Sequence, residues 1–550
     1  MANDLDVAFP VLSPSDMAAL SARGERRAMY AGETLFAEGD RIRSFFVVVE
    51  GAVEIVEHSR GTPHQVAVHG PGQFTGDIDV LSGRAVLVTG RVIEDGTLLQ
   101  LKAEDLRRAV DELPELGEII VKAFLMRRTL ILDDGFAGVK IIGSRFSPDA
   151  HRLRDFAQRN AIPYRFMDLE TDPEAETLLR EVGIAPSETP IVMGRQGQWH
   201  RNPTLEQFAS CAGLTAELEP GHIYDLLVVG AGPAGLAASV YAASEGLDVL
   251  TVDALAAGGQ AGTSSRIENY LGFPAGISGA ELTQNALIQA QRFGARITVP
   301  STVKSLGLDS GDRLVTLEDG TRLQTRCVLV ASGVEYRKLA VPRFGEFEGA
   351  GIYYAATEME ARFCRGEDVV VVGAGNSAGQ AIVYLSKYAR RVHHLVRGKD
   401  LGASMSRYLV DRVQGLENVT VYLGTRVTGL EGNGHLGGVR AQSAEHGEMT
   451  FDTSSLFLFI GADANTEWLR HCVELDKKGF VLTGDALPRS VGENDRWRSS
   501  GRRPSLLETS LPGVFAAGDV RSGSVKRVAS AVGEGAMAVS FVHAHIGRTV

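Results

Sequence analysis

The feature that most constrains the fold is a glycine-rich turn between an apolar run and a helix in the middle of the chain. Residues Leu226–Val229 form a continuous apolar run, which is typical of a parallel strand buried on both faces. The turn that follows, Gly230-Ala-Gly-Pro-Ala-Gly235, offers glycines for a tight bend, for close approach of a pyrophosphate and for helix packing. A second strand, Val249–Val252, ends in Asp253, where an acid would accept a hydrogen bond from a ribose hydroxyl. This order of elements predicts a doubly wound α/β domain that binds a dinucleotide.

The same pattern occurs a second time. The apolar run Val369–Val372 leads into Gly373-Ala-Gly-Asn-Ser-Ala378, and we expect a helix over Gly379–Ala389 and a strand over Val392–Val396. Basic residues follow this strand, and a base favours the 2′-phosphate of NADP where an acid would favour the ribose of NAD. A solvated basic turn is the alternative. The residues expected at this nucleotide are Gly373, Gly375, Asn376, Ser377, Ala378, Arg397, Lys399 and Arg407. Two dinucleotide folds in one chain imply FAD in the first and a nicotinamide donor in the second.

Four further motifs resemble thioredoxin reductase, a pyridine nucleotide-disulfide oxidoreductase. They are Ala256-Ala-Gly-Gly-Gln260, Ile267-Glu-Asn-Tyr-Leu-Gly-Phe-Pro274, Val330-Ala-Ser-Gly333 and Thr509-Ser-Leu-Pro-Gly-Val-Phe-Ala-Ala-Gly-Asp519. The resemblance runs from about Ile223 to the C-terminus and implies a homodimer in which NADPH passes a hydride to N5 of FAD. It also implies that Asp519 binds the ribityl chain and that residues 526–528 meet the isoalloxazine edge, where Arg527 replaces a family glutamine. The residues expected at FAD are Gly230, Gly232, Pro233, Ala234, Gly235, Asp253, Gly259, Gln260, Asn269, Ala331, Gly333, Gly518, Asp519, Lys526, Arg527 and Val528.

The chain departs from thioredoxin reductase at the redox-active dithiol. Where the family carries C-x-x-C, this chain reads Ala355-Ala356-Thr357-Glu358, and dithiol exchange needs both a thiolate and a resolving thiol. The four cysteines, Cys211, Cys327, Cys364 and Cys472, show neither disulfide nor metal-ligand spacing. We expect Cys364 to be a semi-buried, structural cysteine. No catalytic side chain is assigned, because the flavin would carry the chemistry.

The N-terminal region, residues 1–132, has the pattern of a β jelly-roll barrel with helices. We expect two strands in Ser44–Val56 joined at Glu50-Gly51, and helices near Ala103–Glu112 and Leu116–Arg128. The other expected strands are Gln65–Val68, Val86–Val92 and Leu98–Leu101. This arrangement resembles a cyclic nucleotide-binding domain.

The phosphate cassette of that family is altered here. Gly76, Asp77 and Thr89 match the pattern, but Val86 stands where the phosphate-binding arginine belongs, and Arg84 is two residues off register. A cyclic phosphate without a bidentate arginine loses a charge-assisted pair. We therefore favour a degenerate pocket, or one for an unusual ligand, over a cAMP site.

Residues 137–215 show a βαβα order and a Thr189-Pro190 pair before a strand, which resembles glutaredoxin and thioredoxin. Ser144 and Ser147 occupy the C-x-x-C place, so the shape would be kept and the redox chemistry lost. A domain retained for docking or architecture is favoured over a redox role.

The expected architecture is thus multidomain: a jelly-roll barrel, a thioredoxin-like α/β unit, and two Rossmann-like α/β domains. The FAD domain comprises 222–336 and 462–550, and the NAD(P)H domain comprises 337–461. Residues Pro488–Pro504 look like an inserted loop with Trp497 and several arginines. The simpler interpretation is a solvated loop, and the alternative is a binding site for an acidic protein partner.

The predicted function is an NADPH-dependent flavin oxidoreductase that serves an acceptor without a dithiol relay. Flavodoxin, ferredoxin, quinone, a small disulfide and oxygen are open as acceptors. A low-turnover redox or nucleotide sensor, and a true thioredoxin-disulfide reductase using other cysteines, are alternatives. The net charge of −12 argues against a nucleic-acid partner, no apolar run is long enough for a bilayer, and no signal peptide is recognised, so a cytoplasmic location is expected.

Overall fold

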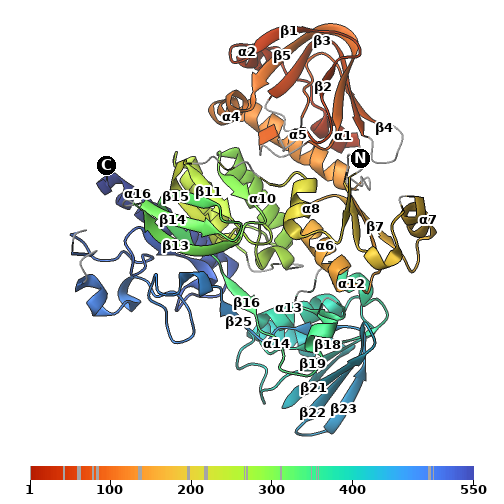
Figure 1. The fold of residues 1–550 in the computed structure, drawn as a ribbon, viewed down its shortest axis with the longest axis vertical. Coiled ribbons are helices and arrows are strands. Elements are labelled where there is room, and N and C mark those ends of the chain that lie inside the picture. The colour runs from red at the N-terminus through yellow and green to blue at the C-terminus, as the bar shows by residue number, and fades with distance from the viewer. Residues whose placement is uncertain are drawn as a thin grey trace.

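The computed structural model describes residues 2–40, 44–57, 64–76, 80–81, 86–133, 139–181, 183–194, 198–215, 218, 221–264, 267, 270–309, 312–348, 350–354, 356, 358–493, 497–498 and 501–549. Figure 1 shows the N-terminal barrel at the top, a four-stranded unit at the right, and two larger sheets at the centre left and at the bottom. No helix in the described ranges combines the length and the apolar character needed to span a membrane.

The barrel is an antiparallel sheet of order β1-β5-β3-β4, with β2 paired to β5. Its strands are β1 (Glu25–Met29), β2 (Thr34–Phe36), β3 (Ser44–Glu57), β4 (His64–His69) and β5 (Thr89–Lys102). Its helices are α1 (Ala2–Ala8), α2 (Pro14–Ser21), α4 (Ala103–Glu112) and α5 (Pro114–Asp133).

Two strand predictions in the barrel were wrong in the same way. Ser44–Val56 is part of one strand rather than two. The strands expected at Val86–Val92 and Leu98–Leu101 merge into the single strand β5, which begins only at Thr89 and leaves residues 86–88 outside it. Gly51, with a φ of +86°, makes an irregularity in the β3–β5 register rather than a turn. A Cβ on Gly96 of β5 would lie 2.0 Å from the carbonyl oxygen of Glu50, so two glycines let the long strands cross closely.

The four-stranded unit, residues 139–214, has the strand order β7-β6-β8-β9. Its strands are β6 (Val139–Gly143), β7 (Tyr164–Asp168), β8 (Ile191–Met193) and β9 (Trp199–Arg201), and its helices are α6 (Pro148–Arg159), α7 (Pro173–Glu181) and α8 (Leu205–Cys211). Strands β6 and β7 are parallel, and the other pairs are antiparallel. The Thr189–Pro190 peptide bond is cis.

The first nucleotide-type sheet has the order β12-β11-β10-β15-β14-β13, with β26 paired to β15. Its strands are β10 (Ile223–Val229), β11 (Val249–Val252), β12 (Arg296–Thr298), β13 (Val303–Asp309), β14 (Asp312–Leu317), β15 (Arg322–Val330) and β26 (Val514–Ala516). Strands β10, β11, β12, β15 and β26 pair in parallel, so their carboxyl ends share one edge of the sheet. Helices α9 (Pro233–Ser244), α10 (Gly279–Arg292) and α16 (Val528–Thr549) contribute to its apolar core.

The second nucleotide-type sheet is parallel, with the order β17-β24-β18-β19-β20. Its strands are β17 (Ile352–Tyr353), β18 (Asp368–Val372), β19 (Arg391–Leu395), β20 (Val419–Tyr422) and β24 (Leu456–Leu458). The helices are α12 (Glu358–Phe363), α13 (Asn376–Leu385) and α14 (Arg407–Gln414), and an antiparallel sheet is formed by β21 (Thr425–Gly432), β22 (Leu436–Ser443) and β23 (Gly447–Asp452). The helix expected over Gly379–Ala389 instead begins directly after Gly375, so that its N-terminus lies at the glycine turn. Strands β16 (Val334–Tyr336) and β25 (Ala462–Ala464) pair where the chain passes between the two nucleotide-type domains.

Candidate cofactor sites

The first glycine turn has the geometry that a bound pyrophosphate requires. Gly230 has a φ of +106°, and a Cβ there would lie 2.2 Å from the carbonyl oxygen of Ala331. A Cβ on Gly235 would lie 1.8 Å from the carbonyl oxygen of Gly230. Helix α9 can therefore approach the turn this closely only with a glycine at position 235. Gly232 is the N-cap of α9, and the one neighbouring atom near a Cβ built on it is the Gly259 Cα, 3.9 Å away. The turn therefore leaves space at a helix N-terminus, where backbone N–H groups attract phosphate.

Loops from several strands converge on this turn. A Cβ on Gly259 would lie 2.9 Å from the Gly232 Cα, and the Gln260 side chain donates to the carbonyl of Val334 at 2.6 Å. A Cβ on Gly518 would lie 3.0 Å from the Cβ of Ala234 at the start of α9, which brings Asp519 beside the turn. The structure thus gathers the expected segments around 230–235, 259–260, 331–333 and 518–519 at one edge of the sheet. Asn269, also expected here, lies outside the described residues.

Asp253 lies at the end of β11, as predicted, and makes contacts that the sequence did not indicate. One carboxylate oxygen accepts from the Ala231 N–H at 2.8 Å, and the other accepts from the N–H groups of Leu255 and Ala256 at 2.9 and 3.0 Å. Burial raises the pKa of Asp253, and these three donors oppose that rise. Its carboxylate therefore joins the glycine turn to the loop after β11, in addition to any contact with a ribose.

The loop that carries Asp519 is held by a residue that sequence reasoning missed. Glu534 of α16 accepts from the Gly518 N–H at 2.8 Å and pairs with Arg521. Burial raises the pKa of Asp519; the charge of Lys526 offsets this rise and that of Glu534 adds to it. Lys526 also donates to the backbone carbonyl of Asp519 at 3.1 Å. Arg527 is exposed directly before Val528, the first residue of α16.

The second glycine turn is organised in the same way around Gly375, the N-cap of α13, where a Cβ would meet no atom within 4 Å. The Asn376 side chain accepts from the Ser406 N–H at 2.7 Å, and Ser377 and Ala378 continue the helix. His394, which sequence reasoning missed, contacts the Gly373 carbonyl through Nε2 at 2.6 Å. Because a carbonyl only accepts, Nε2 carries the proton, and burial lowers the pKa of this histidine.

The basic residues expected near the 2′-phosphate divide into two groups. Arg397 and Lys399 are exposed directly beyond β19, at the carboxyl edge of the sheet where the glycine turn also lies. Arg407, at the start of α14, is 88% exposed and pairs with Asp411 at 2.9 Å. The first two are therefore the better candidates for holding a phosphate.

The described residues around the missing dithiol are buried. Tyr353 and Ala356 are 9% and 6% exposed, and Cys364 is fully buried. Burial raises the pKa of the Cys364 thiol to about 12, so it stays protonated near neutral pH. The expected semi-buried cysteine is thus completely enclosed. All four cysteines are free thiols. Residues 355 and 357 lie outside the described part of the chain, as does the side chain of Glu358.

The described residues of the barrel cassette make apolar and internal contacts. Val86 is 3% exposed and packs in an apolar cluster with Phe36 and Phe46. The Thr89 hydroxyl accepts from the Glu38 N–H at 3.1 Å. Arg127 of α5 donates to the carbonyl of Gly76 at 2.6 Å, so the cassette backbone is bound by this arginine. Asp77 and Arg84 lie outside the described residues.

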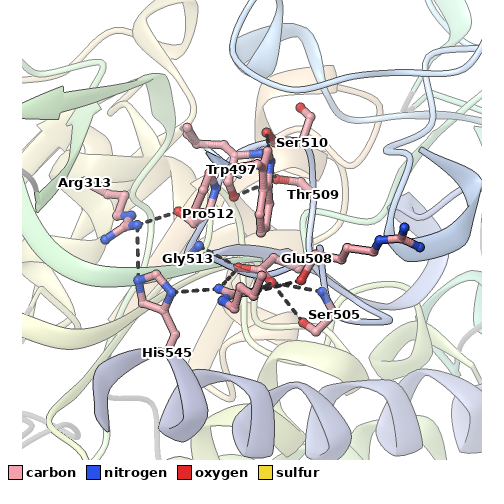
Figure 2. Close-up of polar contacts among 12 residues, drawn as sticks. Arg313, Trp497, Ser505, Glu508, Thr509, Ser510, Pro512, Gly513 and His545 are labelled. Carbon is pink, nitrogen blue, oxygen red and sulfur yellow. Dashed lines mark hydrogen bonds and ion pairs between the residues drawn. The ribbon is translucent and has the colours of Figure 1, made fainter. Parts of the chain in front are cut away.

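The inserted loop is anchored in the interior rather than only solvated. Glu508 is surrounded by donors. Arg502 binds it through both terminal nitrogens. The N–H groups of Ser505 and Gly513, which are labelled beside Glu508 in Figure 2, donate to it at 3.0 and 2.9 Å. The Glu508 side chain is 0% exposed and that of Arg502 is 17% exposed. Trp497 is 1% exposed and donates to the Ser510 carbonyl at 2.8 Å. Trp497 and Arg502 therefore face the protein, which corrects the expectation of a simple solvated loop.

Comparisons with known proteins agree with this geometry. Residues 224–535 match the model of the pyridine nucleotide-disulphide oxidoreductase family, and residues 26–112 match that of the cyclic nucleotide-binding domain. A thioredoxin reductase of Mycolicibacterium smegmatis is 33% identical over 317 residues, which cover 58% of this chain and 94% of that protein. The crystal structure of T. acidophilum thioredoxin reductase is 29% identical, with a TM-score of 0.51 over 58% of this chain and 98% of that one. The structure of Lactococcus lactis thioredoxin reductase in its FR conformation is 24% identical, with a TM-score of 0.52, and shares the fold. The match covers 59% of this chain and 99% of that one. Residues 113–223 lie outside both family models, so the thioredoxin-like interpretation of the four-stranded unit stays a prediction.

Proposed function

Because this chain belongs to the pyridine nucleotide-disulphide oxidoreductase family, we propose that it oxidises NADPH through FAD and passes the electrons to an acceptor without a dithiol relay. The family membership makes it an NAD(P)H-dependent flavin oxidoreductase with FAD and NADPH as cofactors. When bound, the flavin supplies the redox chemistry by accepting a hydride and releasing electrons.

The single observation that carries the proposal is the state of the cysteines. The sequence contains no C-x-x-C, and Cys364, the cysteine closest along the chain to residues 355–358, is enclosed. A buried, protonated thiol cannot attack a disulfide, because the attacking species is the thiolate. Electrons would therefore leave the flavin directly.

The residues around the glycine turns supply binding and orientation. The α9 N-terminus and the loops at 259–260 and 518–519 would hold FAD, with Asp253 fixing the turn itself. The α13 N-terminus would hold the pyrophosphate of NADPH, and Arg397 and Lys399 would bind its 2′-phosphate.

Anaerobic reduction of the yellow protein by NADPH, followed by a screen of acceptors, tests this proposal. We expect flavin bleaching by NADPH, reoxidation by at least one non-dithiol acceptor, and no reduction of thioredoxin. A flavin that NADPH leaves oxidised would contradict the proposal, as would steady reduction of thioredoxin at an enzymatic rate.

A low-turnover sensor is a second candidate, because α5 joins the barrel to the four-stranded unit: Arg127 binds the cassette carbonyls of Phe74 and Gly76, and Arg128 donates to the Ala161 carbonyl at 3.3 Å. In that case a ligand of the barrel would alter the flavin site, and turnover with every acceptor would be slow. We also expect a homodimer, which light scattering of the holoprotein would test.

A further inference from the structure

The four-stranded unit contacts both nucleotide-type domains, and one contact uses the loop that would carry a dithiol in a thioredoxin. In the loop Ser144–Ser147, the Phe146 ring stacks on His435 with centroids 4.7 Å apart and planes 27° apart. His435 lies in the turn between β21 and β22, within the second nucleotide-type domain. The loop is also bound to its own unit, because Ser144 donates to Glu170 at 2.6 Å and Arg145 pairs with Asp168 at 2.8 Å.

A second contact lies beside the place of the other missing dithiol. His151 of α6 packs on Tyr353 with ring centroids 5.7 Å apart, and Tyr353 in turn packs on Phe457 of β24 at 5.4 Å. Tyr353 ends β17, two residues before position 355. Its 9% exposure shows that the Tyr353 side chain is covered. The loop Ser144–Ser147 and Tyr353 thus both belong to contacts between the four-stranded unit and the second nucleotide-type domain.

The opposite end of α6 is bound to the first nucleotide-type domain. Asn160, which follows α6, donates to the Leu255 carbonyl at 3.1 Å, and Leu255 packs against the apolar core of the four-stranded unit. Leu255 is also one of the residues whose N–H binds Asp253. One helix therefore spans both domains, with aromatic contacts at its start and a buried amide at its end.

We propose that the four-stranded unit is a built-in, redox-inactive docking module that packs on Tyr353 and holds the two nucleotide-type domains in one arrangement, so that the electron acceptor is a small molecule and not a dithiol protein. This inference rests on the proposed function. A protein disulfide would have to approach across the face where α6 packs on Tyr353, whereas a small oxidant does not need that face. For a quinone the reaction balances as NADPH, one proton and quinone giving NADP⁺ and hydroquinone, with two electrons transferred.

A cross-link across the interface tests the inference with the full-length holoprotein. The variant Phe146→Cys/His435→Cys would be joined by a short bismaleimide; both positions are partly or largely exposed, so the substitutions do not disturb a core. The single variants and Tyr30→Cys, which lies on the barrel with 66% exposure, receive the same reagent as controls for modification elsewhere.

We expect an intramolecular cross-link with and without NADPH, and a rate of benzoquinone reduction within about twofold of the treated single variants. A loss of tenfold or more in the cross-linked protein alone would show that turnover requires the unit to move, and would overturn the inference. Failure to cross-link would show that the unit is not docked, with the same consequence. If NADPH does not reduce the native flavin, the proposed function fails, and the cross-linking yield still decides whether the unit is docked.

Discussion

Replacing Arg502 by methionine should be among the most destabilising single changes in the FAD domain. Arg502 binds Glu508 through two terminal nitrogens, and its guanidinium lies over the Trp497 ring at 5.1 Å. Glu508 is fully buried and directly precedes the segment that leads to β26 and Asp519. Methionine fills a similar volume but leaves a buried carboxylate without its counter-charge.

The expected cost follows from that uncompensated charge. Removing one partner of a buried ion pair costs about 3–5 kcal/mol of unfolding free energy. The N–H groups of Ser505 and Gly513 remain as donors to Glu508, which places the expected cost within that range and not above it. A surface pair of the same domain provides the matched control: Arg470 and Glu467 are 64% and 73% exposed, and Arg470→Met should cost less than about 1 kcal/mol.

The assay is thermal unfolding followed by release of flavin fluorescence, which reports the FAD domain of a multidomain chain. For a domain of this size about 2–4 °C is lost per kcal/mol, so Arg502→Met should lower the transition by about 6–20 °C and Arg502→Lys by less. In the native protein the pKa of Glu508 is lowered, so this group's contribution to stability is complete above its ordinary pKa and is lost as pH falls through the lowered value.

In Arg502→Met the direction of the Glu508 pKa shift reverses, because burial without the arginine raises the pKa of this carboxyl group. A raised carboxyl pKa gives stability that is lost as pH rises, so the deficit of the variant should be larger at pH 8 than at pH 5. An Arg502→Met transition within about 2 °C of that of Arg470→Met, or a stability deficit that does not change with pH, would refute the reasoning.

Three further outcomes are expected. Arg397→Gln/Lys399→Gln should reduce the preference for NADPH over NADH in rapid flavin reduction by at least about tenfold, since each lost charged hydrogen bond costs about 1.5–3 kcal/mol. Lys387→Gln, an exposed substitution in the same domain, should leave this preference unchanged. Equal rates of flavin reduction by NADPH and NADH in the native protein would contradict the assignment. Calorimetry should show no submicromolar binding of cAMP, because Val86 is buried in an apolar cluster where the family carries arginine; tight binding would show that the pocket is intact. Cys364→Ser should leave quinone reduction unchanged and thioredoxin reduction absent, and a native thioredoxin activity that this variant loses would mean that the enclosed thiol becomes accessible during turnover.

The glycine turns could be predicted from the sequence because the strand, the glycines and the helix of each turn follow one another directly along the chain. The distant segments that close around the first turn, such as Ala331 and Gly259, appear only in the fold. The basic residues after β19 could be placed for the same reason, since the strand end fixes their position.

The residues that sequence reasoning missed bind partners that are distant along the chain. His394 reaches Gly373 across a strand pair, and Glu534 reaches Gly518 from a helix sixteen positions away. The single long strand β3 depends on the contact between Glu50 and Gly96, which no local pattern reveals. Glycine after glutamate is typical of a turn, and only the partner strand shows that it is an irregularity in a continuous strand.

The two adjacent arginines of α5 have a mechanical consequence. Arg127 binds the cassette carbonyls, whereas Arg128 donates to the Ala161 carbonyl of the four-stranded unit at 3.3 Å. Successive residues of an α-helix point about 100° apart, so the two side chains leave α5 in different directions. A rotation of α5 about its axis that moved Arg127 away from the cassette carbonyls would also move Arg128 relative to Ala161. The helix would thus couple the two contacts. A displacement of α5 at the barrel would then be transmitted through Ala161 to its neighbour Asn160. Asn160 donates to the Leu255 carbonyl, so the displacement would reach the first nucleotide-type domain.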